Sequence, residues 1–225
     1  MVFGIITYNG RKNNLIILFD LDGTLIDSTE AILESFHNSF LFYNLPVPAD
    51  EKITALIGHP LDVMYKELGV QEDMIWDFVT TYKEHYRQIS TQKTILLDNA
   101  KEAVESAAEF ASLGIVTTKT GEYSQILMEH FAIMDKFDVL IGREHVEHPK
   151  PHAQPILKAL EHFDTSNQEI WMIGDTKLDL LSARNAGINS IGVLSGYDTE
   201  KTLKEFTNVI FRDSLEAVKY LKSRK

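Results

Sequence analysis

The chain contains no cysteine, which excludes disulfide bonds, thiolate catalysis and cysteine-ligated metals. Basic residues are in the minority, because 22 Lys and Arg stand against 33 Asp and Glu, and the formal net charge is -11. Such a surface repels nucleic acid and anionic membranes, so neither is expected as a partner, and an anionic substrate requires a local positive site. Long hydrophobic runs are also absent, since stretches such as Leu15–Phe19 are far too short to cross a bilayer.

The composition that remains is that of a globular protein, with 44% hydrophobic and 24% charged residues in a chain of 225. This length suits one large domain, or a domain with a smaller one attached. Apolar Met1–Thr7 is followed by the turn pair Asn9-Gly10 and by basic Arg11-Lys12, whereas an export signal has its basic residues first. We therefore predict a short leader strand or tail at this end, and a cytoplasmic location.

Short apolar runs alternate with helical patterns along most of the chain. The predicted strands are Leu15–Phe19, Gly114–Thr117, Val139–Ile141, Ile170–Ile173, Ser190–Leu194 and Asn208–Phe211. The predicted helices between them are Ala100–Ser112, Glu122–Phe131, Ala153–Phe163, Leu178–Ala186 and Leu215–Leu221. Continuous apolar strands that alternate with helices indicate an α/β fold with a doubly wound parallel sheet, in which ligands bind beyond the carboxyl ends of the strands.

The stretch from Ser28 to Lys93 interrupts this alternation, because it has helical periodicity and almost no strand signal. Within it, Asp50 is a candidate N-cap for a helix over Glu51–Ile57, and Gly58-His59-Pro60 ends that helix. Further helices are predicted over Leu61–Leu68 and Glu72–Tyr86. The stretch is too long for a simple crossover, so we predict an inserted helical cap over 28–93 and a discontinuous core over 1–27 and 94–225.

The strongest chemical signal follows the first strand, in Asp20-Leu21-Asp22-Gly23-Thr24. Residues i and i+2 of a strand point the same way, so the two carboxylates are expected to share one small site. Their repulsion would be relieved by a hard divalent cation such as Mg²⁺, which prefers oxygen ligands. The alternative is a polar turn that caps the strand, but the position at the end of a core strand favours a site.

Three further elements lie at predicted strand ends. Thr117 precedes a helix, Lys150 stands between two prolines, and Gly174-Asp175 is followed by Asp179 one helical turn later. Taken singly, these are typical of a helix cap, a loop lysine and a solvated helix face. Their order and their common position at strand ends favour a single site at one edge of the sheet.

With these motifs in place, the chain resembles the haloacid dehalogenase superfamily, and most closely its phosphoglycolate-phosphatase-like branch with a helical cap. The resemblance extends over nearly the whole chain. Two departures are Thr118, where many relatives have Asn, and Leu97–Ala100, where relatives have a Pro-Gly turn. The resemblance implies a Mg²⁺-dependent phosphatase that acts on a small phosphorylated metabolite, with 2-phosphoglycolate as the best guess.

The same resemblance implies the residue roles. Asp20 is the nucleophile and Asp22 the general acid and base, while Mg²⁺ is held by Asp20, the Asp22 backbone carbonyl and Asp175. Asp179 orients Asp175 or a metal-bound water. The phosphate is expected to contact Gly23, Thr24, Thr117, Thr118 and Lys150. In the cap, His59 and Lys66 are the candidate substrate contacts.

Other readings of the sequence remain open at this point. A phosphomutase similar to β-phosphoglucomutase would use Asp20 and Asp22 in the same roles, and a pyrophosphatase or nucleotidase of the same superfamily would share all the motifs. A receiver-like signalling module also combines Asp, Thr and Lys on such a sheet, but receivers are shorter and lack the insertion. A catalytically inactive binding protein is disfavoured because every motif position is present.

Overall fold

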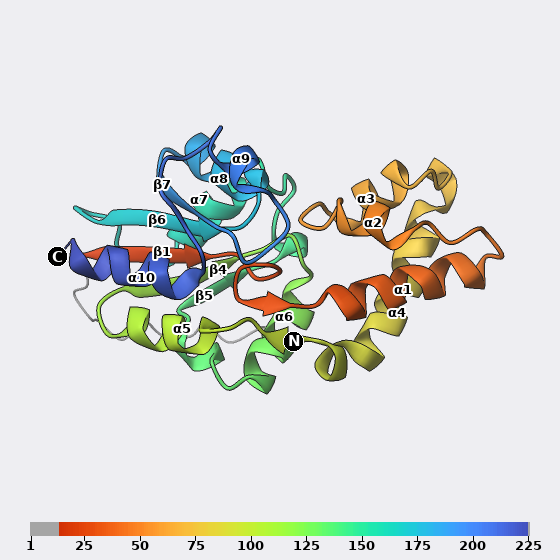
Figure 1. Cartoon of the computed structure of the whole chain (residues 1–225), viewed down its shortest axis with the longest axis horizontal. Coiled ribbons are helices and arrows are strands. Elements are labelled where there is room, and N and C mark those ends of the chain that lie inside the picture. Colours follow the sequence, from red (N-terminus) through yellow and green to blue (C-terminus); the bar gives the residue numbers. More distant parts are fainter. Residues whose placement is uncertain (1–13, 225) are drawn as a thin grey trace.

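A six-stranded parallel sheet forms the centre of the protein, as seen in a computed structural model that describes residues 14–224 (Figure 1). The strands are β1 (Leu15–Phe19), β4 (Ser112–Val116), β5 (Val139–Ile141), β6 (Glu169–Gly174), β7 (Asn189–Val193) and β8 (Ile210–Phe211). Their order in the sheet is β5-β4-β1-β6-β7-β8. All six predicted strands are present, with ends that match or are shifted by one or two residues, which confirms the doubly wound α/β fold.

Strand β1 lies in the middle of the sheet and is buried along its whole length, which explains its continuous apolar sequence. Its alternate side chains enter two hydrophobic clusters, one on each face of the sheet. One face is covered by α5, α6 and α10, and the other by α7 and α8 (Figure 1). The first three helices are α5 (Ala100–Ala108), α6 (Gly121–His130) and α10 (Ser214–Ser223), and the other two are α7 (Gln154–Leu160) and α8 (Lys177–Ala186). A short helix, α9 (Glu200–Leu203), follows β7.

The helices between Thr29 and Lys93 form a separate body beside the carboxyl ends of the strands (Figure 1). They are α1 (Thr29–Phe42), α2 (Asp50–Thr54), α3 (Leu61–Glu67) and α4 (Ile75–Lys93). Their shared core is aromatic, with Phe36, Tyr65 and Phe78 fully buried and in ring contact. We call this body the cap, and its hydrophobic cluster is distinct from the two clusters on the faces of the sheet.

A two-stranded antiparallel ribbon connects the cap to the sheet. It pairs β2 (Ile26–Asp27) with β3 (Ile95–Leu96). The chain therefore leaves the core and returns to it side by side, and the predicted domain boundaries at 27/28 and 93/94 fall at this ribbon. Strands of two residues carry no readable periodicity, which is why the sequence did not predict them.

Several local expectations differ from the structure. Asp50 is the first residue of α2 rather than its cap, a place taken by Ala49. Strand β4 ends at Val116, so Thr117 lies just beyond it. The predicted strand or tail at Met1–Thr7 and the turn at Asn9-Gly10 lie outside the described residues. Within residues 14–224, no helix combines the length and apolar character needed to span a bilayer.

Candidate active site

The predicted motifs converge at the carboxyl ends of three neighbouring strands. Asp20 follows β1, Thr117 follows β4 and Asp175 follows β6, and β1 is hydrogen-bonded to both of the other strands. The backbone N–H of Asp20 donates to Ile173 O at 3.0 Å, which continues the ladder between β1 and β6. The parallel sheet thus brings together residues that are more than 150 positions apart in the chain.

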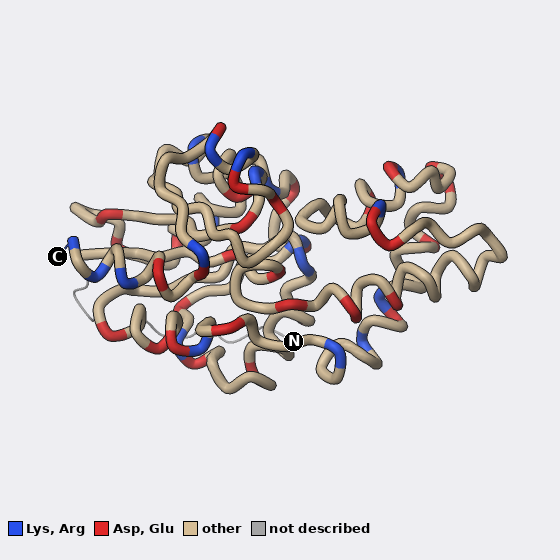
Figure 2. The backbone as a smooth tube through the Cα atoms, viewed as in Figure 1, with Lys and Arg blue, Asp and Glu red and all other residues tan. Residues whose placement is uncertain are grey.

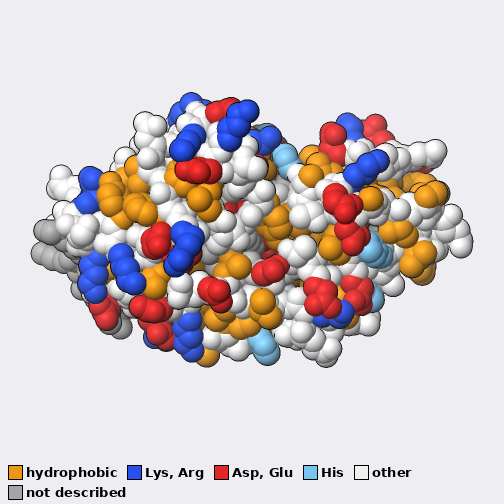
Figure 3. Space-filling model, viewed as in Figure 1, with side chains coloured by type: hydrophobic (Ala, Val, Ile, Leu, Met, Phe, Trp, Pro, Cys, Tyr) orange, Lys and Arg blue, Asp and Glu red, His pale blue; other side chains and the backbone are white. Residues whose placement is uncertain are grey.

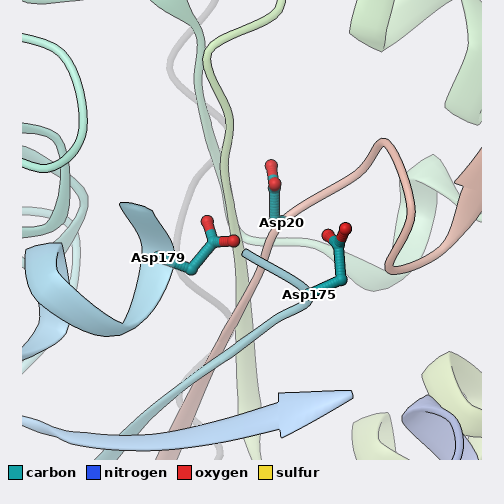
Figure 4. Close-up of side chains that lie close together, drawn as sticks. All are labelled: Asp20, Asp175 and Asp179. Atoms are coloured by element: carbon teal, nitrogen blue, oxygen red, sulfur yellow. The ribbon is translucent and has the colours of Figure 1, made fainter. Parts of the chain in front are cut away.

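Three buried carboxyl groups form an acidic cluster at this edge. One oxygen each of Asp20, Asp175 and Asp179 lies within 4.8 Å of the others, and the three groups point to the same side in Figure 4. Burial, with the nearby Asp179 adding to it, raises the pKa of Asp20 to about 7, against the opposing effect of Lys150. Burial and the two neighbouring carboxylates also raise the pKa of Asp175 well above its usual range.

Lys150 supplies the one ammonium group seen in contact with this cluster among the described residues. It is buried, and its Nζ lies 2.9 Å from Asp20 Oδ1 and 2.5 Å from Asp179 Oδ1. It also donates to Val116 O at 3.1 Å. Burial alone would lower the pKa of Lys150, but Asp179 and Asp20 outweigh it and raise this pKa. The lysine is therefore held as a cation between two site carboxylates.

The carboxylate of Asp175 is held in place by two hydrogen bonds, and it lies against the backbone of two glycines. Thr24 Oγ1 donates to one of its oxygens at 2.9 Å, and the N–H of Tyr197 donates to the other at 2.9 Å. The Thr24 hydroxyl, predicted to contact phosphate, is instead directed to Asp175. A Cβ at Gly23 would lie 2.3 Å from Asp175 Oδ2, and one at Gly196 would lie 2.0 Å away. Only glycine leaves room for this carboxylate.

Gly23→Ala is expected to raise the Mg²⁺ concentration needed for half-maximal activity about tenfold or more, because it displaces Asp175. Gly69→Ala is the matched control. Both glycines have a left-handed φ, +83° and +86°, but a Cβ at Gly69 meets nothing within 4 Å. Both variants carry the conformational cost of about 1 kcal/mol. An equal Mg²⁺ requirement in the two variants, measured by titration of activity, would contradict this placement of Asp175.

Asp179 belongs to the first turn of α8 as well as to the site. Its Oδ2 accepts from the N–H of Thr176 at 3.0 Å and from the Thr176 hydroxyl at 2.7 Å, so it caps the helix. Its other oxygen accepts from Lys150. Both carboxylate oxygens of Asp179 are therefore fixed by hydrogen bonds, and the residue is itself a member of the acidic cluster.

The carboxylate of Asp22 is not part of this buried group of three. The chain turns after Leu21, whose carbonyl accepts from the N–H groups of Thr24 and Leu25, so strand alternation ends before Asp22. Lys119 Nζ donates to both Asp22 oxygens at 3.1 and 3.0 Å, and Ser28 Oγ donates to Oδ1.

Lys119 is a site residue that the sequence analysis missed. It is nearly buried, and it lies 4.7 Å from the centroid of the Tyr86 ring as well as beside Asp22. Burial would lower the pKa of Lys119, but Asp22 in particular outweighs burial and raises it. Its position two residues after Thr117 was the available signal, although a lysine near a strand end is more often a surface residue.

The threonines after β4 connect the core with the cap. Thr117 is buried at the strand end, and its hydroxyl accepts from the N–H of Lys119 at 3.2 Å. Thr118 Oγ1 donates to Gly58 O at 2.9 Å, so this predicted phosphate contact binds the cap loop in the structure. The loop Gly58-His59-Pro60 therefore lies against the residues that follow β4.

The two predicted cap contacts have different positions. His59 lines the cavity between cap and core, and partial burial followed by the charge of Lys177 lowers its pKa. Lys66 is exposed on α3 and is not among the residues that line this cavity. Helical spacing alone did not show which side of α3 faces the core.

The chemistry of the cluster fits a hard divalent cation. Three buried carboxyl groups face one ammonium group, so full ionisation leaves a deficit of positive charge. Asp20 Oδ1 is buried and, apart from the Lys150 ion pair, makes no hydrogen bond within the described residues. Oxygen ligands of this kind are those that Mg²⁺ prefers.

Mg²⁺ is expected to stabilise the protein more at about pH 8 than at about pH 6. Without metal, the folded-state pKa of Asp20 is about 7, above its ordinary 3.8, so folding favours the neutral carboxyl. The stability contributed by this group is full below about pH 4 and is lost as the pH rises through about 7, where the ionised group needs a cation. Thermal melts with and without Mg²⁺ measure this difference. An Mg²⁺ shift that is equal at both pH values would contradict it.

Comparison with known proteins places the chain in a family. Residues 17–193 match the haloacid dehalogenase-like hydrolase family, and the chain belongs to it. Pyrophosphatase PpaX of Bacillus cereus is 30% identical over 181 residues, which cover 79% of this chain and 82% of that protein.

Solved structures share the fold. A haloacid dehalogenase-like hydrolase from Streptococcus pneumoniae has a TM-score of 0.81 at 28% identity, covering 92% of this chain and 99% of the other. A predicted phosphoglycolate phosphatase from Haemophilus somnus has a TM-score of 0.82 at 24% identity, covering 94% and 100%. Both confirm the doubly wound α/β fold, and the recognised family is the one that the motifs indicate.

Proposed function

We propose that this protein is a Mg²⁺-dependent phosphatase that hydrolyses a small phosphomonoester through a covalent aspartyl-phosphate on Asp20. The observation that carries the proposal is the buried cluster of Asp20, Asp175 and Asp179, two of which pair with Lys150, at the sheet edge that faces the cap. A nucleophilic carboxylate, a cation-binding acid pair and a fixed ammonium are the groups that phosphoryl transfer requires.

In the first half of the reaction, a carboxylate oxygen of Asp20 attacks phosphorus. The new bond joins Asp20 to phosphorus, and the bond from phosphorus to the leaving oxygen breaks while Asp22 gives that oxygen a proton. In the second half, Asp22 takes a proton from the water that attacks phosphorus. The Asp20–phosphate bond then breaks, and inorganic phosphate leaves.

The remaining residues position and neutralise these groups. Lys150 would offset negative charge beside Asp20, and Thr117 would donate to a phosphate oxygen. Mg²⁺ would be held by Asp20, Asp175 and the Asp22 carbonyl, with Asp179 orienting this set, and it would neutralise charge on the phosphoryl group. The cap excludes water from the intermediate.

Surface charge is consistent with a small-molecule substrate. Acidic and basic residues are interspersed along the core and the cap (Figure 2), on a chain of net charge -11. The buried ammonium of Lys150 provides a local positive group for a phosphate against that background. We therefore propose a phosphorylated metabolite as the partner.

A phosphate-release screen tests the proposal. The panel contains 2-phosphoglycolate, which the family resemblance suggests, and pyrophosphate, which the name of the PpaX relatives suggests, together with nucleoside monophosphates and sugar phosphates. We expect steady release from at least one phosphomonoester, loss of activity in EDTA and recovery with Mg²⁺. Conversion of a sugar phosphate to its isomer without steady release of inorganic phosphate would indicate a mutase instead. Activity that survives EDTA would contradict the metal requirement.

A further inference from the structure

A cavity of about 230 Å³ lies between the cap and the core, directly beside Asp22. Figure 3 shows the surface notched where these two bodies meet. Asp22, Thr118 and Lys119 line the cavity from the core, and α4 and the loop at Gly58 line it from the cap. Because Asp22 protonates the leaving oxygen in the proposed mechanism, this cavity is where the leaving group of a substrate would lie.

The walls of the cavity are largely aromatic and aliphatic. The rings of Tyr82 and Tyr86 are stacked with centroids 5.6 Å apart and planes inclined by 11°, and Tyr123 continues the row at 5.7 Å from Tyr86. The aliphatic lining consists of Ile32, Ile57, Met64 and Val79, which are buried, and Leu61, which is partly exposed. Trp76, an exposed residue of α4, also lines the cavity. Rows of aromatic rings favour an apolar or aromatic ligand.

The charged groups around the cavity balance one another. The basic residues in the lining are Lys83, Lys119 and Arg143, and the acidic ones are Asp22, Asp62 and Glu144. Lys119 is already neutralised by Asp22, and Glu144 accepts from the N–H groups of Gly121 and Glu122. The lining therefore offers no excess of positive charge to an anionic leaving group such as phosphate or glycolate.

One polar group in the lining is incompletely satisfied. The hydroxyl of Tyr86 is buried and makes no hydrogen bond of normal geometry within the described residues, although the ammonium of Lys119 interacts with this hydroxyl as well as with the ring. A buried hydroxyl without a well-formed hydrogen bond is costly. A ligand with one hydrogen-bonding group in this cavity would satisfy it.

The size of the cavity also exceeds what a two-carbon group fills. A cavity of about 150 Å³ is enough to hold benzene, and this one measures about 230 Å³. We propose that the preferred substrate is a phosphomonoester whose leaving group contains a largely apolar ring with one hydrogen-bonding substituent. This inference rests on the proposed function, and it makes 2-phosphoglycolate and pyrophosphate weaker substrates than such an ester.

The test compares phenethyl phosphate with ethyl phosphate, because their leaving alcohols are similarly weak acids and differ in the ring. We expect kcat/KM for phenethyl phosphate to be higher by about 30-fold or more, as expected for burial of one aromatic ring. Trp76→Ala should lower kcat/KM for phenethyl phosphate and leave ethyl phosphate unchanged. Trp76 is exposed, so its removal should not affect folding. Phe42→Ala, which removes another exposed aromatic residue of the cap but one outside the cavity, is the control and should change neither substrate.

Two kinds of failure are distinguishable. Three results would overturn this inference alone, provided that phosphate release still depends on Asp20. They are an absence of preference for the ring, a higher kcat/KM for 2-phosphoglycolate or pyrophosphate, and equal effects of Trp76→Ala on both esters. Release that persists in Asp20→Asn, or no release from any ester, would overturn the proposed function and this inference with it.

Discussion

Asp20→Asn is expected to lower phosphate release by about four orders of magnitude or more, as loss of a covalent nucleophile does in other enzymes. The amide is nearly the same size as the carboxylate, but its uncharged oxygen is a poor nucleophile. Asp20 is buried and lies 2.9 Å from Lys150. Initial rates at saturating Mg²⁺ measure the effect.

The matched control for this variant is Asp73→Asn. Asp73 is exposed in the cap, and the same change of charge there should leave the rate unchanged. A thermal melt of each variant verifies that the fold is intact. If Asp20→Asn retained a rate within tenfold of the wild type, the covalent mechanism would be wrong.

Lys150→Met is expected to lower the melting temperature of the metal-free protein by about 10 °C or more and to abolish activity. The ammonium is the cation that contacts Asp20 and Asp179 in the buried cluster, and it is almost completely buried itself. Removal of one partner from a buried ion pair costs about 3–5 kcal/mol, since it leaves a buried charge without compensation. Because a bound cation would offset part of that charge, Mg²⁺ should restore some of the lost stability but not the activity.

Lys222→Met provides the comparison at the surface. Lys222 pairs with Glu109 at 2.9 Å, but both side chains are at least half exposed. Exposed ion pairs contribute about 1 kcal/mol or less. Thermal melts should therefore separate the two lysine variants clearly, and a Lys150→Met protein that melted like Lys222→Met would show that the cluster does not depend on this ammonium.

The sequence predicted the sheet and the acidic cluster well, for a physical reason. In a parallel sheet the carboxyl ends of neighbouring strands share one edge, so Asp20, Lys150 and Asp175 could be placed together from motif positions alone. β1 was found with its correct ends because a strand covered on both faces is apolar throughout.

What the sequence did not predict depends on contacts between distant residues. The turn after Leu21 directs Asp22 to Lys119 and Ser28, and strand alternation cannot indicate a turn. The Thr24 hydroxyl is directed to Asp175, which lies 151 positions away. These partners become visible only when the sheet order is known.

The cap cavity was missed for a related reason. Tyr82 and Tyr86 recur at helical spacing, and such a pattern indicates a hydrophobic core. Both residues do belong to the cap core, but the same rings also line the cavity that faces the site. Periodicity identifies the buried face of a helix and does not show whether a cavity lies against it.

The most direct test of the covalent mechanism is detection of the phosphoryl group on Asp20. Asp22→Asn should still be phosphorylated by 4-nitrophenyl phosphate, whose acidic leaving group needs no protonation, while hydrolysis of the intermediate slows for want of a base. Rapid acid quench followed by peptide mass spectrometry should then find one phosphoryl group on the peptide that contains Asp20, and none after Asp20→Asn. A phosphoryl group on another residue would contradict the mechanism. Turnover that gives no phosphorylated peptide, together with full activity of Asp20→Asn, would contradict it as well.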